Sequence, residues 1–219
     1  MNISEIKKSI CSEIDKKREK IISIGEEIYK NPELGYKERR TTELVFREFT
    51  ELGLNPEKDI AVSGCQGRVD FSKNGPVIAV MGELDAVSCP EHKDADRETG
   101  AVHACGHNIQ VASMIGAAIG IISSGAVSDL CGSVNFIAVP AEEFIELAFR
   151  SSLKDKGEIT WFGGKQELIK KGYFDNIDIS IMIHSLDLFS LSNGEASKKV
   201  LIGPSGNGFI GKEINFIGK

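Results

Sequence analysis

Positive charge and long apolar runs are both scarce in this sequence. Its 26 Lys and Arg residues are outnumbered by 32 Asp and Glu residues, which gives a net charge of −6. Nucleic acid and anionic membranes bind basic surfaces, so neither partner is expected. No apolar run approaches the roughly 20 residues that cross a bilayer. The first residues also lack the apolar core and cleavage site of a signal peptide, so we expect a cytoplasmic protein.

Cysteine is sparse and irregularly placed, with five residues in the chain. An odd number without regular spacing favours free thiols in a reducing compartment over a disulfide framework. A free cysteine is usually a small buried hydrophobic residue. Cys105 differs from the other four because a glycine and then His107 follow it directly.

Apolar residues recur with helical spacing in some segments and form continuous runs in others. The helical pattern predicts helices over residues 4–30, 37–52, 108–122 and 164–172. Strands are predicted over residues 67–71, 77–81, 134–139 and 177–183, with a turn at residues 73–76. Residues 146–160 are charged and predict irregular structure. The alternation of buried strands with helices predicts a three-layer α/β/α domain.

Side chains able to bind a metal follow the ends of predicted strands and precede a predicted helix. Cys105 and His107 stand before the apolar helix. The pair Glu142-Glu143 follows one strand and His184 follows another. The carboxyl ends of parallel strands meet at one edge of a sheet, so these groups can share a site. Thiolate, imidazole and carboxylate together suit zinc or a similar transition metal, and one glutamate could bind the metal while the other acts as a general base.

Each part of this pattern also has an ordinary structural explanation. A Cys-Gly-His sequence is more often a turn, a Glu-Glu pair is more often solvated surface, and a lone histidine after a strand is more often a hydrogen-bonded core residue. From spacing alone, the metal centre and these explanations are about equally supported. A nucleophilic Cys105 with His107 as its base is a third possibility, although residues two positions apart rarely face each other at a helix start.

The motifs resemble those of the M20 family of metallopeptidases and amidohydrolases in order and in context. They are Pro32-Glu33-Leu34-Gly35, His103-Ala104-Cys105-Gly106-His107-Asn108, Val139-Pro140-Ala141-Glu142-Glu143 and His184. The chain is most similar to the aminoacylase-like branch, which includes aminobenzoyl-glutamate and indoleacetyl-amino-acid hydrolases. The resemblance implies a hydrolase that cleaves the amide bond of an N-acyl amino acid or small peptide with a metal-activated water.

The resemblance also implies a role for each candidate site residue. Glu142 would be the general base, and Asp85 would be the acidic residue that orients the site. Glu83 stands where other branches of the family have a ligating histidine. The implied cofactor is a divalent metal, as two ions of zinc, manganese or cobalt. The implied metal ligands are Cys105, His107, Glu143 and His184.

Three features depart from the family pattern, and the first is Asp85-Ala86-Val87-Ser88, followed by a longer loop, where the family typically has Asp-Ala-Leu-Pro. Asn108 and Gln110 stand where many relatives have Asp and His. Residues 144–162 form a longer segment than in most relatives. These differences put the substrate preference in doubt more than they do metal binding.

The resemblance divides the chain into two parts. Residues 1–204 would be the N-terminal part of the hydrolase domain, and residues 205–219 would begin a lid domain through which a full-length protein forms a homodimer. We expect a C-terminal truncation on this basis, with exposed apolar strand edges and a poorly soluble chain. The alternative to an active hydrolase is an inactive remnant, or a subunit of a split hydrolase that binds metal or a partner chain.

Overall fold

The computed structural model describes residues 1–185 of the 219-residue chain. No helix within this part is long and apolar enough to cross a membrane. The predicted domain boundary after residue 204 and the predicted lid strand lie outside the described residues.

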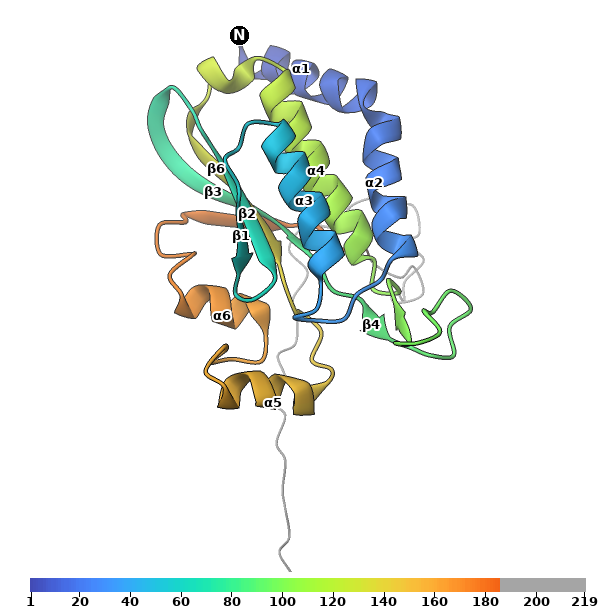
Figure 1. Cartoon of the computed structure of the whole chain (residues 1–219). Helices are drawn as coiled ribbons and strands as arrows, with labels where there is room; N and C mark the ends of the chain where they lie inside the picture. Colours follow the sequence, from blue (N-terminus) through green and yellow to red (C-terminus); the bar gives the residue numbers. More distant parts are fainter. Residues whose placement is uncertain (186–219) are drawn as a thin grey trace, which may run out of the picture. The chain divides into compact units, whose positions relative to one another are not determined.

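A five-stranded sheet in the order β1-β2-β6-β3-β7 forms the centre of the fold (Figure 1). Strands β3, β6 and β7 run parallel to one another, and β2 is antiparallel to both β1 and β6. A short antiparallel ribbon, β4 with β5, forms a second sheet. The bounds are β1 Glu57–Ile60, β2 Gly64–Asp70, β3 Lys73–Glu83, β4 Val87–Ser88, β5 Ala101–Val102, β6 Cys131–Val139 and β7 Ile179–Met182.

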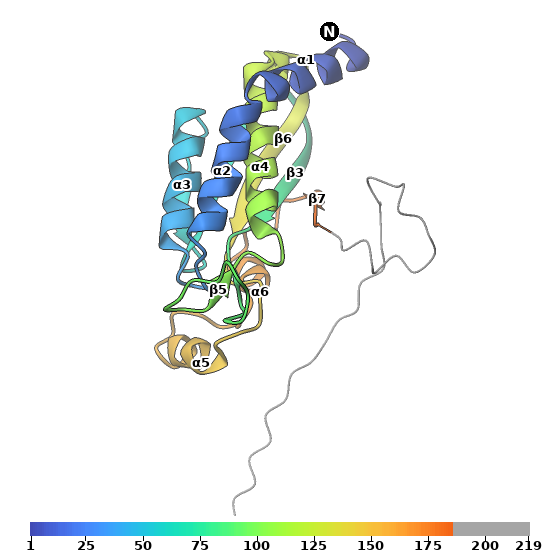
Figure 2. The same cartoon turned by 90° about the vertical axis from the view of Figure 1, so that its right-hand side faces the viewer.

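Helices cover both faces of the large sheet. Figure 2 shows α2, α3 and α4 side by side on one face. Alternate residues of β6 contribute to two different cores, because successive side chains of a strand point to opposite faces. Phe136 packs with the helices of the first face, whereas Ile137 packs with Leu168 of α6 on the second. The helix bounds are α1 Ile3–Lys16, α2 Arg18–Lys30, α3 Arg39–Glu51, α4 His107–Ser123, α5 Leu147–Asp155 and α6 Gly164–Lys170.

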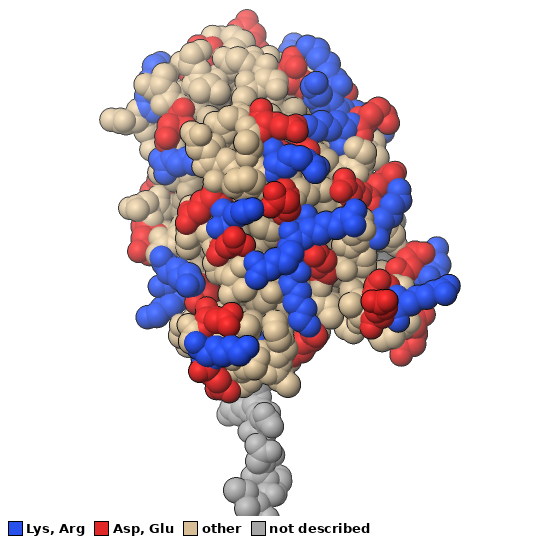
Figure 3. All heavy atoms as spheres, viewed as in Figure 1, with Lys and Arg blue, Asp and Glu red and all other residues tan. Residues whose placement is uncertain are grey.

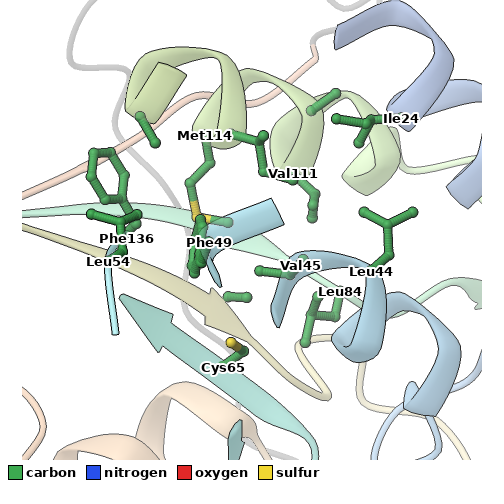
Figure 4. Close-up of a cluster of buried hydrophobic side chains, with 14 of the residues drawn as sticks. Ile24, Leu44, Val45, Phe49, Leu54, Cys65, Leu84, Val111, Met114 and Phe136 are labelled. Carbon is green, nitrogen blue, oxygen red and sulfur yellow. The ribbon is translucent and has the colours of Figure 1, made fainter. Parts of the chain in front are cut away.

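The larger core lies between β6 and helices α3 and α4 (Figure 4). Phe49 of α3 and Phe136 of β6 meet there with ring centroids 6.0 Å apart, and both are fully buried. Burying one such aromatic side chain stabilises a fold by about 2–3 kcal/mol. The α/β architecture predicted from apolar periodicity is confirmed.

The single helix predicted over residues 4–30 is wrong, because the chain bends at Lys17 and forms α1 and α2. Both helices pack against α4. A side chain at Gly120 would lie 2.7 Å from Ile14 of α1, and one at Gly116 would lie 3.3 Å from Ile21 of α2. The bend lets the isoleucine faces of α1 and α2 both pack along the buried helix α4. Helical periodicity alone does not reveal this tertiary contact.

Two local predictions in the later chain are also wrong. Residues 146–160 are not wholly irregular, because α5 forms over Leu147–Asp155 with Arg150 and Leu153 buried on one face. Residues 73–76 belong to β3 rather than to a turn, with a register irregularity before Val77. Strand β1 was not predicted, since three of its four residues are exposed.

The charged side chains show no large region of one sign on the face drawn in Figure 3, where basic and acidic groups are interspersed. Strand β7 is short, and all four of its residues are exposed. Ile181 and Met182 are 48% and 36% exposed, and since successive side chains point to opposite faces, apolar side chains face outward from both sides of this strand.

Candidate metal centre

The parallel register of β3 and β6 brings the candidate residues together. Glu83, the last residue of β3, pairs with Val139, the last residue of β6. The segments that leave these two strands therefore run side by side, one carrying Asp85 and the other carrying Glu142 and Glu143. On the other side of β3, strand β7 ends at Met182 and delivers His184 to the same end of the sheet.

Helix α4 begins at this end of the sheet and places His107 against Glu83. The approach requires a glycine in β3, since a side chain at Gly82 would lie 3.1 Å from the Cα atom of Val111. Gly106, at the N-cap, adopts a left-handed conformation with φ of 85°. This turn leaves Cys105 outside the helix and turned toward His184.

Cys105, His107 and His184 form the first group of possible ligands. Their ligand atoms all lie within 4.8 Å of one another. Cys105 Sγ lies 3.5 Å from His184 Nε2, and the two histidine rings meet edge to face at 5.9 Å. The hydroxyl of Ser185 donates to the Cys105 carbonyl at 3.0 Å, which ties the end of the β7 segment to the α4 start.

Glu83, His107 and Glu142 form a second group within the same distance limit and share His107 with the first. His107 Nε2 lies 3.0 Å from Glu83 Oε2, while its Nδ1 lies 2.7 Å from the carbonyl oxygen of Asp85. Glu143 belongs to neither group, although its carboxylate lies 3.8 Å from His107 Nε2. Glu142 was predicted as the base and Glu143 as the ligand, and both carboxylates face this histidine.

The electrostatics of the site depend on the close packing of these acids. Burial disfavours a charged ring, but hydrogen bonds to Asp85, Cys105 and Glu83 outweigh burial and raise the pKa of His107 to about 12. Burial and the charge of Glu83 raise the pKa of Glu142. Without a metal, a protonated imidazole therefore balances part of the carboxylate charge.

Lys165, at the start of α6, was not predicted to lie in the site. Its ammonium forms an ion pair with Glu83 and lies 3.4 Å from the carboxylate of Glu142. Gln110 supports Glu83 from the other side, because its amide donates to Glu83 Oε2 at 2.9 Å and accepts from the Glu83 N–H at 3.2 Å. Asn108 instead donates to the carbonyl of Gly25, so it belongs to the contact between α2 and α4.

The early Pro-Glu-Leu-Gly segment supports the site through hydrogen bonds to neighbouring main-chain groups. Glu33 accepts hydrogen bonds from the N–H groups of Arg40 and Thr41 at 3.0 and 2.8 Å, which caps the start of α3. The carbonyl of Glu33 accepts from the N–H of Ala86 at 2.8 Å. Glu38, a few residues later, is fully buried and accepts from the N–H of Ala141 at 2.7 Å. Sequence periodicity gave no sign that Glu38 is buried.

The donor set fits a divalent transition metal. His107 Nε2 and Asp85 Oδ1 are buried atoms without a well-aligned hydrogen-bond partner among the described residues. Such atoms are costly unless a cation or proton satisfies them. Sulfur, imidazole and carboxylate are the ligands that zinc and its neighbours prefer, and ligation would displace the proton held on His107. His103 lies beside this set, and its two ring nitrogens have no hydrogen-bond partner among residues 1–185. Burial lowers its pKa to about 4.

Comparisons with known proteins agree with this chemistry. No family model matches the chain. The chain is 30% identical over 168 residues to thermostable carboxypeptidase 2 of Saccharolobus solfataricus, covering 75% of this chain and 38% of that protein. It is 27% identical to an IAA-amino acid hydrolase, ILR1-like 4, of Arabidopsis thaliana, covering 89% of this chain and 40% of that protein.

A solved structure shares the fold. The Bacillus subtilis YXEP protein, described as a dinuclear metal binding peptidase from the M20 family, matches with a TM-score of 0.58 and 24% identity, over 74% of this chain and 41% of that one. The chain is therefore similar to an M20 peptidase in its fold. The chain spans only 38% and 40% of the length of the two curated relatives. The fold expected of an M20 catalytic domain is confirmed for the described residues.

Proposed function

We propose that this chain supplies the metal ligands and the general base of a hydrolase that cleaves the amide bond of an N-acyl amino acid or small peptide. The observation that carries the proposal is the convergence of Cys105, His107 and His184 within 4.8 Å of one another, with Glu142 on the other side of His107. The curated relatives include a carboxypeptidase and an amino acid conjugate hydrolase, which supports this reaction class.

The metal would be held chiefly by Cys105, His107 and His184, with Glu143 as a further ligand. Glu83 would contribute a carboxylate to a second divalent ion. Zinc, manganese and cobalt are the candidates. When bound, such an ion polarises an amide carbonyl and acidifies water.

Glu142 is the general base in this proposal. Its raised pKa brings the carboxylate closer to the working pH, where a base can both accept a proton and return it. Glu142 takes a proton from the attacking water and then delivers it to the leaving amine nitrogen. Asp85 accepts the N–H of Glu143 at 2.9 Å and so orients the segment that carries both glutamates.

Glu142→Gln tests this assignment. We expect hydrolysis of a panel of N-acetyl amino acids and dipeptides to be lost after incubation with zinc, manganese or cobalt, while metal content stays unchanged. Glu158→Gln, an exposed glutamate beyond α5, is the matched control. Activity that survives in the Glu142 variant would refute its role as the base. Activity that resists chelators would instead favour Cys105 as a nucleophile.

One observation favours a second candidate function. The exposed apolar side chains of β7 are suited to contact further polypeptide, as in a subunit of a split hydrolase. In that case the chain binds metal alone but hydrolyses substrate only after a second chain is added.

A cytoplasmic location and homodimerisation of the complete protein remain part of the proposal.

A further inference from the structure

The turn that carries Glu142 has a strained backbone. Ala141 adopts a left-handed conformation with φ of 50°, which is unfavourable for a residue with a side chain. Such a conformation persists only where its surroundings hold it. Ala141 immediately precedes Glu142, so the groups that hold Ala141 also set the direction in which the Glu142 carboxylate points.

Arg150 of α5 contacts this turn on both sides of Glu142. Its Nη1 donates to the carbonyl of Ala141 at 3.3 Å and to that of Phe162 at 2.8 Å. Its Nη2 donates to the carbonyl of Glu143. Within the described part of the chain, this fully buried guanidinium thus donates to three main-chain carbonyls, and two of them flank the proposed base.

Two buried carboxylates hold the N–H groups of the same residues. Glu38 accepts from the N–H of Ala141 at 2.7 Å, and Asp85 accepts from the N–H of Glu143 at 2.9 Å. The residues before and after Glu142 are thus each bound at both the N–H and the carbonyl. Arg150 donates to the two carbonyls, and its positive charge lies close to Asp85 and Glu38, which accept from the two N–H groups.

The space around Arg150 is closely filled. A side chain at Gly35 would lie 2.5 Å from Arg150 Nη2 and 2.9 Å from the Cα atom of Ala141. The ring of Tyr36 packs against the guanidinium, with its centroid 5.5 Å from Arg150 Cζ. Gly35 therefore leaves the gap through which Arg150 reaches the turn.

We propose that Arg150 is a positioning residue that fixes the orientation of Glu142 by holding the carbonyls of Ala141 and Glu143. The catalytic meaning of this contact rests on the proposed function of Glu142. A planar guanidinium can bind several carbonyls in fixed directions, whereas a lysine ammonium is a single point of charge and cannot span them. The residue lies in the segment 144–162, so the base is held by a part of the chain that contains no candidate ligand.

The test compares Arg150→Lys and Gly35→Ala with the wild-type chain. Arg150→Lys keeps the charge, and Gly35→Ala keeps the arginine but obstructs it. Arg18→Lys, an exposed arginine of α2, is the matched control. The readouts are the exchange rates of the Ala141 and Glu143 amides by NMR, the stoichiometry of cobalt binding, and the values of kcat and KM.

Both variants should exchange the amides of Ala141 and Glu143 at least tenfold faster, with the β6 amides and the cobalt stoichiometry unchanged. The value of kcat should fall about 10- to 100-fold with KM nearly constant, because a misplacement of about 1 Å can reduce the rate 100-fold. Unchanged exchange at both amides would overturn the proposal, as would faster exchange spread evenly over the chain. A wild-type protein that hydrolyses none of the substrates would refute the proposed function, while the two amides would still report whether Arg150 holds the turn.

Discussion

Glu38 is the buried acid whose charge state should control stability most directly. It is fully buried, and its carboxylate accepts from the N–H of Ala141 at 2.7 Å and from the hydroxyl of Ser63 at 2.5 Å. Burial, followed by the negative charge of Asp85, raises the pKa of Glu38 from 4.5 to about 7, although both hydrogen bonds act in the opposite direction. Glu38→Gln would remove the ionisable group while keeping an oxygen that accepts from Ala141.

The raised pKa of Glu38 determines how the free energy of unfolding changes with pH. Between pH 4.5 and about pH 7 the folded chain keeps a proton on Glu38 that the unfolded chain has released. The free energy of unfolding therefore falls as the pH rises through this interval and levels off above it. A pKa that moves from 4.5 to about 7 corresponds to about 3 kcal/mol. The glutamine variant lacks this loss, so at pH 8 its free energy of unfolding should exceed that of the wild type by up to this amount.

Urea unfolding at pH 5, 6, 7 and 8, with a chelator present, measures the effect. The difference between Glu38→Gln and the wild type should grow with pH and then become constant. Glu158→Gln, an exposed glutamate, should follow the wild-type curve at every pH. A difference that does not depend on pH, or a glutamine variant that is less stable than the wild type at pH 8, would refute the reasoning.

Two further predictions concern the metal. Lys165→Met removes the ammonium that pairs with Glu83 and makes the site more negative. Calorimetry should therefore show zinc binding several-fold more tightly to this variant than to the wild type. Weaker binding would show that Lys165 helps to assemble the site. Cys105→Ser should abolish the thiolate-to-cobalt absorption band. The control variant Cys11→Ser, which removes an exposed free cysteine, should keep the band. A band that persists without Cys105 would exclude that thiol as a ligand.

The meeting of the candidate residues could be predicted because it depends on strands. Segments rich in apolar residues predicted β3, β6 and β7, and parallel strands that end together place their following residues together. That logic brought Cys105, His107 and His184 to one end of the sheet, as the structure confirms. Their roles as ligands stay predictions.

The supporting residues could not be predicted, because their partners are main-chain groups far away in the sequence. Glu38 binds the N–H of Ala141, 103 positions later, and no local pattern records such a contact. Arg150 and Lys165 stand in polar segments where a charged residue is normally solvated. Their burial depends on carbonyls and carboxylates that meet them only after the sheet has formed.

The position of His184 has a consequence for the least covered strand of the sheet. This histidine lies two residues beyond β7, whose four residues are all exposed. Any ligand that binds His184 together with Cys105 joins the β7 segment to the α4 start, and its binding free energy opposes the local opening of that strand. Detachment of β7 and loss of the ion are then thermodynamically linked, so the protection of β7 amides should rise with occupancy of the site.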